Sequence, residues 1–152
     1  MAINDINEEV AKAGNDLLEY LYDSCNGYQE CAEQVADPTM KQLFSDLAQH
    51  RQQMISELKT QVRMSDEEPT ESGSITGAAH RRFIDVKSLL TGGNTESIVK
   101  EVKRGESYTI DRYKEILSKN LPSAIKQILL KQLTEIESDV AKIDAIKNRS
   151  IM

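Results

Sequence analysis

Aromatic residues and turn residues are scarce in this chain of 152 residues. It has no tryptophan, two phenylalanines and five tyrosines, which argues against an aromatic-rich β-sandwich. Seven glycines and three prolines are too few turn residues for many short strands. The composition instead favours an all-helical protein, because charged residues make up 29% of the chain and long stretches are rich in Ala, Leu, Glu, Lys and Gln.

Long hydrophobic runs and paired cysteines are also missing. No stretch approaches the roughly 18 apolar residues of a membrane span. The first residues contain neither a basic region nor an apolar run, so we expect a cytoplasmic protein with no signal peptide and no membrane partner. The spacing of Cys25 and Cys31 matches neither a redox pair nor a zinc knuckle, and both are therefore expected to be buried free thiols.

Charge is distributed unevenly along the chain. Residues 1–74 hold 15 acidic and 5 basic residues, whereas residues 75–152 hold 10 acidic and 14 basic residues. The two halves should attract each other, within one chain or between two chains. The net charge of −6 argues against duplex nucleic acid, because binding to it depends on neutralising phosphates. We therefore expect a homodimer or a protein partner.

Apolar residues recur at spacings of three and four over most of the chain, which predicts amphipathic helices. Asp37 followed by Pro38 marks a helix start, with Asp as the N-cap. Asn26 and Gly27 leave open whether the first helix is continuous. We predict a single domain over residues 1–152 with five helices. They lie near 5–36, 38–64, 75–90, 95–118 and 122–147.

The lengths of the connections predict the topology. Very short turns join the first two long helices and the last two, so each pair should form an antiparallel hairpin. The joint between the pairs is about 30 residues long and includes the predicted helix over 75–90. A 25-residue helix is roughly 38 Å long. The joint, with its own helix and flanking loops, is long enough to cross this distance. The third long helix would then run parallel to the second, which is the connectivity of a ferritin-like four-helix bundle.

Three polar residues interrupt the apolar stripes at helical spacing. They are Arg51, Glu106 and Gln132, and Asp139 lies just beyond the last of them. If the turns at Asp37 and Asn120 lie at one end of the bundle, the three side chains meet in its middle. Such a network, with Tyr28 as a further partner, would be either a functional site or a device that sets helix register, since a buried charge must be paired.

Several short segments resemble those of a known family. They are residues 28–35, Leu47-Ala48-Gln49-His50-Arg51, Ser72-Gly73-Ser74, His80-Arg81, Leu90-Thr91-Gly92-Gly93 and Arg104-Gly105-Glu106. Together they are similar to a bacterial domain-of-unknown-function family of four-helix bundles in the ferritin-like superfamily. The resemblance implies a rubrerythrin-like fold but no established activity, and some members are regarded as stress-associated.

The superfamily's di-iron site takes two Glu residues and two Glu-x-x-His motifs from four helices. Neither histidine completes such a motif here, because Leu47 lies three residues before His50 and Gly77 three before His80. Compared with the rubrerythrin-like pattern, Arg51 and Met54 stand where Glu and His are expected. The other positions that correspond to metal ligands in this pattern are Leu21 or Asp23 on the first helix, Glu106 on the third, and Glu137 and Asp139 on the fourth.

The resemblance therefore implies a degraded di-iron motif. We expect no cofactor and no intact metal site, with Arg51 supplying positive charge to Glu106 through a bidentate pair. The protein is then most simply a non-catalytic structural or interaction protein. An alternative is an altered carboxylate site for iron or another divalent metal that uses Glu106, Glu137, Asp139 and His50, with iron oxidation or peroxide scavenging as its chemistry. A small-ligand binder with a bundle cavity is a third possibility.

Overall fold

The computed structural model describes residues 3–71 and 95–146, and this part of the chain is all-helical. It contains four helices, α1 (Ile3–Gln34), α2 (Pro38–Met64), α5 (Thr95–Leu117) and α6 (Ser123–Ile146). The four long helices predicted from the sequence are confirmed, with ends that differ by a few residues at most. The short helix predicted over 75–90 lies outside the described residues.

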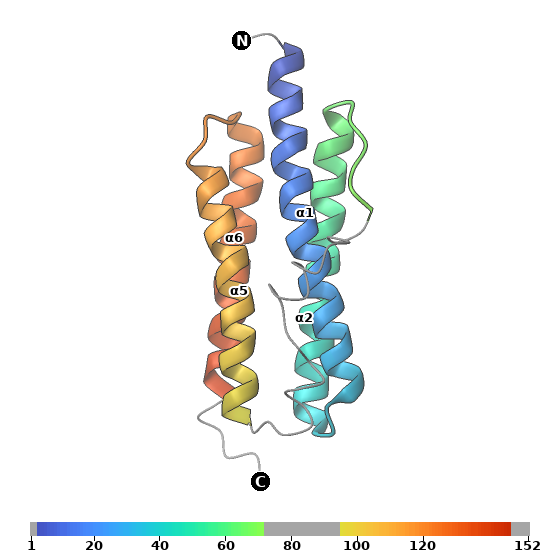
Figure 1. The fold of residues 1–152 in the computed structure, drawn as a ribbon, viewed down its shortest axis with the longest axis vertical. Helices are drawn as coiled ribbons and strands as arrows, with labels where there is room; N and C mark the ends of the chain where they lie inside the picture. Colours follow the sequence, from blue (N-terminus) through green and yellow to red (C-terminus); the bar gives the residue numbers. More distant parts are fainter. Residues whose placement is uncertain (1–2, 72–94, 147–152) are drawn as a thin grey trace.

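The helices form two antiparallel hairpins that stand side by side, α1 with α2 and α5 with α6 (Figure 1). The turn between α1 and α2 lies at one end of the bundle, and the turn between α5 and α6 lies at the other. As a result α5 runs parallel to α2, as the length of the connection predicted. The end of α2 and the start of α5 are therefore separated by the length of the bundle (Figure 1).

Local sequence explains where the first hairpin turns. The side chain of Asp37 accepts a hydrogen bond from the backbone N–H of Thr39 at 3.0 Å, and Pro38 occupies the first turn of α2, where its missing N–H costs nothing. α1 is continuous through Asn26 and Gly27. Two glycines, at positions 14 and 27, are therefore tolerated inside this helix, and tertiary packing outweighs their weak helix propensity.

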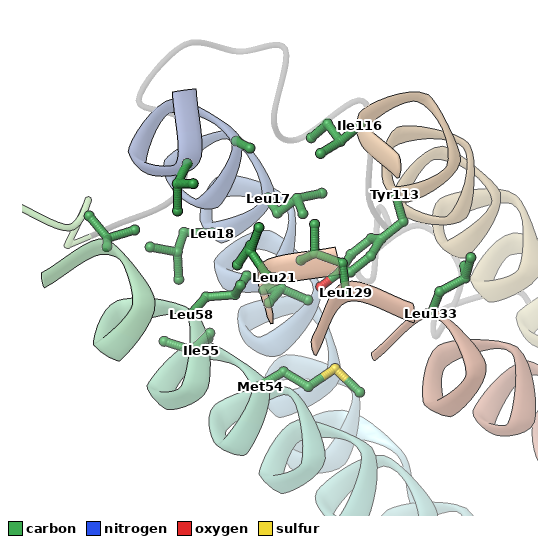
Figure 2. Close-up of a cluster of buried hydrophobic side chains, with 14 of the residues drawn as sticks. Leu17, Leu18, Leu21, Met54, Ile55, Leu58, Tyr113, Ile116, Leu129 and Leu133 are labelled. Atoms are coloured by element: carbon green, nitrogen blue, oxygen red, sulfur yellow. The ribbon is translucent and has the colours of Figure 1, made fainter. Parts of the chain in front are cut away.

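Apolar side chains form two clusters along the bundle. The larger cluster, here called the first apolar cluster, includes Leu17 and Leu21 of α1, Leu58 of α2 and residues of α5 and α6 near their turn (Figure 2). The second apolar cluster lies at the end with the α1–α2 turn and includes Phe44, Val102 and Ile143. Polar residues of all four helices lie between the two clusters, and they form the site described below.

The α1–α2 pair is the most closely packed in the bundle, and α2 and α6 make the fewest contacts of the neighbouring pairs. Gly14 shows why α1 and α2 approach so closely. A Cβ atom added there would lie 2.7 Å from Cγ2 of Val62, which is fully buried. The absence of a side chain at position 14 therefore allows the two helices to touch.

This contact predicts the effect of adding one methyl group. Gly14→Ala should destabilise the fold by about 1–3 kcal/mol through overpacking against Val62, despite the better helix propensity of alanine. Urea denaturation followed by circular dichroism measures the change. The double variant Gly14→Ala/Val62→Ala should recover part of the loss, giving a positive coupling between the sites. Additive losses would show that the two residues do not compete for the same space.

Candidate functional site

Arg51 of α2 is at the centre of the polar layer between the two clusters. It is the largest fully buried side chain of the described residues, with 0% exposure. Its Nη1 donates to Oδ2 of Asp139 at 2.8 Å, and its Nη2 donates to Oε1 of Glu106 at 3.2 Å. A single guanidinium thus joins α2 to both α5 and α6. The sequence predicted a bidentate pair with Glu106, whereas in the structure the guanidinium makes one contact with Glu106 and one with Asp139.

The remaining helix, α1, contributes Tyr28 to the same group of side chains. Its hydroxyl donates to Oε1 of Glu106 at 2.6 Å, and its ring lies 5.7 Å from Cζ of Arg51, within the range of a cation–π contact. On its other side the Tyr28 ring stacks with Phe44 at 6.1 Å between centroids. The structure therefore brings Tyr28, Arg51 and Glu106 together, as expected, and adds Asp139 as the second carboxylate.

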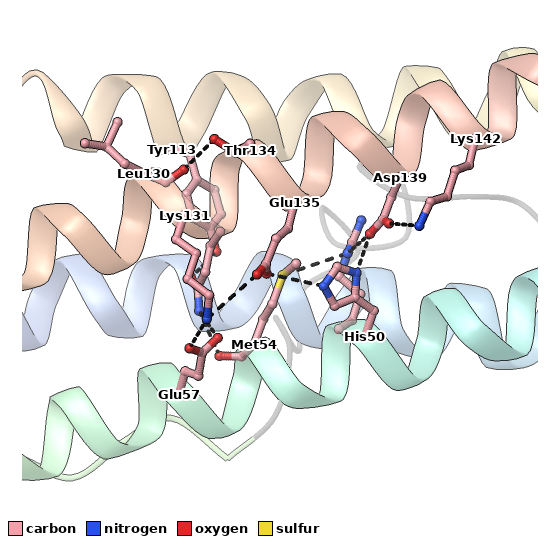
Figure 3. A network of polar contacts seen from close by, with 12 residues as sticks. His50, Met54, Glu57, Tyr113, Leu130, Lys131, Thr134, Glu135, Asp139 and Lys142 are labelled. Carbon is pink, nitrogen blue, oxygen red and sulfur yellow. Dashed lines mark hydrogen bonds and ion pairs between the residues drawn. The ribbon is translucent and has the colours of Figure 1, made fainter.

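His50 links this buried group to the surface along the α2–α6 edge (Figure 3). Its Nδ1 lies 2.6 Å from Oδ2 of Asp139 and its Nε2 lies 3.3 Å from Oε2 of Glu135. The imidazole side chain is 28% exposed and lines a surface groove of about 380 Å³ beside Asp139 and Lys142. Lys142 lies 3.9 Å from Oδ1 of Asp139. Glu135 was not singled out in the sequence, although it precedes Asp139 by one helical turn.

Gln132 belongs to a separate, neighbouring network. Its Oε1 accepts from the Tyr113 hydroxyl at 2.8 Å, and its Nε2 donates to the backbone oxygen of Met54 and to Glu57, both at 3.3 Å. Gln132 is fully buried, as its place on the apolar stripe indicated, but no hydrogen bond joins it directly to Arg51, Glu106 or Tyr28 among the described contacts.

The positions of the two turns explain this difference. They lie at opposite ends of the bundle, as the predicted parallel course of the second and third long helices requires, so the condition under which all three side chains would meet is not fulfilled (Figure 1). Arg51 and Glu106 still meet, because each lies near the middle of its helix. Gln132 lies closer to the α5–α6 turn, beside Tyr113. Asp139, two helical turns further along α6, reaches Arg51 in its place.

Burial and charge shift the protonation of the buried groups. Desolvation raises the pKa of Tyr28 well above the usual value for tyrosine, and the neighbouring Glu106 carboxylate raises it further. Burial by itself would lower the pKa of Arg51, but Glu106, Tyr28 and Asp139 together raise it, so the guanidinium stays charged. Burial also raises the pKa of the Cys31 thiol to about 12, which makes it unreactive at neutral pH.

The network does not satisfy every polar atom. Oε2 of Glu106 and Nε of Arg51 are buried without a hydrogen-bond partner. An unpaired buried polar atom costs free energy, about 1–3 kcal/mol for a neutral group and more for a charged one. The attraction between Arg51 and Glu106 must therefore offset the cost of removing both charges from water. The pair is for this reason costly to break, although it is not strongly stabilising in itself.

Of the four residues proposed as metal ligands, His50, Glu106 and Asp139 lie in one network around Arg51, and Glu137 lies apart from it. Glu137 is exposed, whereas Glu106 and Asp139 are buried. Asp139 lies at Nδ1 of His50, and Glu135 lies at Nε2 on the other edge of the ring. A metal ion bound to one of these nitrogens would therefore be within reach of only one of the two carboxylates. Within residues 3–71 and 95–146, no group of three His, Cys, Asp or Glu side chains is placed to hold a metal.

The family model described as "Domain of unknown function (DUF2383)" matches residues 9–119. The chain belongs to this family. The match includes Tyr28, Arg51 and Glu106, whereas Glu135 and Asp139 of α6 lie beyond it. No curated protein matches the chain. None of the helices in the described part of the DUF2383 chain is both long and apolar enough to cross a membrane.

The buried charge of this DUF2383 bundle predicts a large effect for Arg51→Leu. Removing the guanidinium leaves Glu106 and Asp139 without their shared partner and should destabilise the fold by about 3–5 kcal/mol. Urea denaturation measures the difference, with Lys103→Leu as the control. Lys103 pairs with Asp144 at 2.9 Å but is 41% exposed, and its loss should cost less than about 1 kcal/mol.

A triple variant separates the charge from the packing. Arg51→Leu/Glu106→Leu/Asp139→Leu removes all three charged groups together and should be more stable than Arg51→Leu alone, because no carboxylate is left unpaired. If Arg51→Leu differs from the wild type no more than Lys103→Leu does, the buried network is not a constraint on the fold.

The raised tyrosine pKa values predict behaviour at alkaline pH. Tyr28 and Tyr113 are fully buried and their pKa values are raised, first by desolvation, so the folded state keeps both hydroxyls protonated. Their contribution to stability is complete below about pH 10, the value for an unfolded tyrosine, and is lost as the pH rises further. Near-ultraviolet absorbance should show Tyr28 and Tyr113 ionising together with alkaline unfolding, and Tyr28→Phe should reduce the absorbance change that accompanies unfolding.

Proposed function

We propose that this protein is a metal-free helical scaffold of the ferritin-like kind, which acts through protein contacts and not through catalysis. The observation that carries the proposal is the place of Arg51. Its guanidinium is fully buried in the middle of the bundle and contacts carboxylates of both α5 and α6. In ferritin-like di-iron proteins, inward-facing carboxylates of the bundle core hold metal ions.

Arg51 and a metal ion are alternatives at such a position, because each supplies positive charge to the same carboxylates. The Arg51 guanidinium lies 3.2 Å from Glu106 and 2.8 Å from Asp139. An ion bound by the same two carboxylates would therefore lie close to the guanidinium, in a region of low dielectric. Repulsion between the two cations would then be strong. The arrangement supports a scaffold in which an internal cation has replaced metal, and with it the redox chemistry.

The topology supports the ferritin-like part of the proposal. Two antiparallel hairpins with α5 parallel to α2 are the connectivity of that superfamily (Figure 1). A bacterial origin, a role in stress and a cytoplasmic location are expectations that rest on the sequence and its resemblance, and they belong to the same proposal.

The proposed partner is a second copy of the chain or another protein. The uneven charge supports this, since the exposed residues of α1 include Asp5, Glu8, Glu9 and Glu33, whereas the second half of the chain is basic. Light scattering tests the homodimer. A mass of twice 17.1 kDa is expected, and a single species of 17.1 kDa would exclude a homodimer and leave a different protein as the partner.

Elemental analysis tests the absence of metal chemistry. The protein is purified without an affinity tag from a host supplied with iron, manganese and zinc. We expect metal far below one equivalent per chain, and a melting temperature that neither a chelator nor added metal changes, because a bound ion would stabilise the folded state.

Near-stoichiometric metal that is lost in Glu106→Ala and kept in Glu137→Ala would overturn the proposal. Glu137 is the matched control, since it is an exposed carboxylate of α6 that makes no contact with the buried network among the described residues. That result would favour the carboxylate metal protein, with iron oxidation or peroxide scavenging as the first activities to assay.

A further inference from the structure

The segment that follows α2 is bound to the α1–α2 hairpin in the manner of a peptide ligand. Residues 66–71, here called the strap, turn back from the end of α2 and run beside the hairpin without helical structure (Figure 1). Asp66 makes the turn in the left-handed conformation, with a φ of 58°. The N–H of Glu67 donates to the carbonyl oxygen of Val62 at 3.3 Å, and this bond closes the helix and fixes the direction of the strap.

The side-chain amide of Asn15 in α1 binds the backbone of the strap with both of its polar groups. Its Nδ2 donates to the carbonyl oxygen of Glu68 at 3.3 Å, and its Oδ1 accepts from the N–H of Thr70 at 2.8 Å. The hydroxyl of Tyr22 donates to the carbonyl oxygen of Thr70 at 2.9 Å. Three backbone groups of the strap are therefore bound by side chains of α1. Main-chain hydrogen bonds of this kind give affinity in peptide recognition.

The side chains of the strap add selectivity to these contacts. Pro69 lies between the two residues that Asn15 binds, and it is buried. A proline has no N–H to satisfy and restricts the backbone of the residue before it, so the segment loses little freedom on binding. Beyond it, Glu71 pairs with Lys59 of α2 at 3.0 Å. The site thus selects a proline between two backbone-bound residues, followed by an acidic residue.

The strap is held by few contacts and carries charge of one sign. Its four carboxylates are exposed, and they are Asp66, Glu67, Glu68 and Glu71. They belong to the half of the chain with 15 acidic and 5 basic residues, and Lys59 is the only cation paired with the strap among the described residues. Repulsion between like charges opposes docking. No residue of the strap belongs to either apolar cluster, so the strap can leave the hairpin while the core stays packed.

We propose that this face of the α1–α2 hairpin is a peptide-docking site and that the strap is its internal occupant. Release of the strap exposes Asn15, Tyr22 and Lys59 to a segment of a partner protein with the same chemistry, in which a proline lies between two backbone-bound residues and an acidic residue follows. The strap is then an autoinhibitory contact that the partner displaces. This inference deepens the proposed role in protein contacts and rests on it.

The backbone N–H of Thr70 offers a way to release the strap. Thr70→Pro removes this donor, whereas Thr70→Ala keeps it and is the matched control. Thr70 lies outside both apolar clusters, so neither change should affect the helical fold, which circular dichroism checks. The probe is a synthetic peptide of residues 65–71, acetylated and amidated so that its ends carry no charge.

NMR titration of the full chain with this peptide measures docking through the signal of the Asn15 side-chain amide. We expect saturable binding to Thr70→Pro at millimolar concentrations of peptide. Binding to the wild type and to Thr70→Ala should be about tenfold weaker, because the strap competes for the site at a high effective concentration. The double variant Asn15→Leu/Thr70→Pro should not bind, and a peptide that itself carries Thr70→Pro should bind to none of these proteins.

Three results would contradict the docking site. They are equal binding to the wild type and Thr70→Pro, binding that persists without Asn15, and no binding to Thr70→Pro. Any of them would leave the metal-free scaffold standing, because metal content tests that proposal separately and no metal enters the peptide titration.

Discussion

The buried charge of Arg51 is the constraint on which the middle of the bundle depends. A guanidinium with no exposed surface must be surrounded by acceptors, since leaving one unpaired inside a protein costs several kcal/mol. The acceptors come from α5 and α6, and Tyr28 of α1 completes the group. This requirement fixes both the height and the rotation of each helix, because a shift by one residue would turn an acceptor away from Arg51.

The same layer organises the rest of the fold. It divides the apolar core into two clusters, each of which is closed by one of the two turns. It also adds polar contacts to the α2–α6 edge, while the α1–α2 pair is held by close contact of small and apolar residues such as Gly14 and Val62. The bundle thus has one tightly packed pair of helices, α1 and α2, and an α2–α6 edge that carries ion pairs such as that of Arg51 with Asp139, and His50 lies at the solvent side of that edge.

Much of the fold and part of the site could be predicted from the sequence. The apolar spacing gave the four long helices, and Asp37 with Pro38 marked the start of α2, because these signals depend on residues close together in the chain. Arg51 and Glu106 were recognisable as charges on apolar stripes. Gln132 carried the same signal but belongs to the network of Tyr113. The pattern along one helix shows which residues face inward, and it does not show at what height they meet another helix.

The sequence by itself therefore determined which residues are helical and which polar side chains are buried, since both follow from local periodicity and from the cost of burying charge. Only the tertiary structure decided the pairing. It made Asp139, and not Gln132, a partner of Arg51, and it set His50 between Asp139 and Glu135. Those contacts join residues more than 80 positions apart, and their geometry depends on how four helices pack at once.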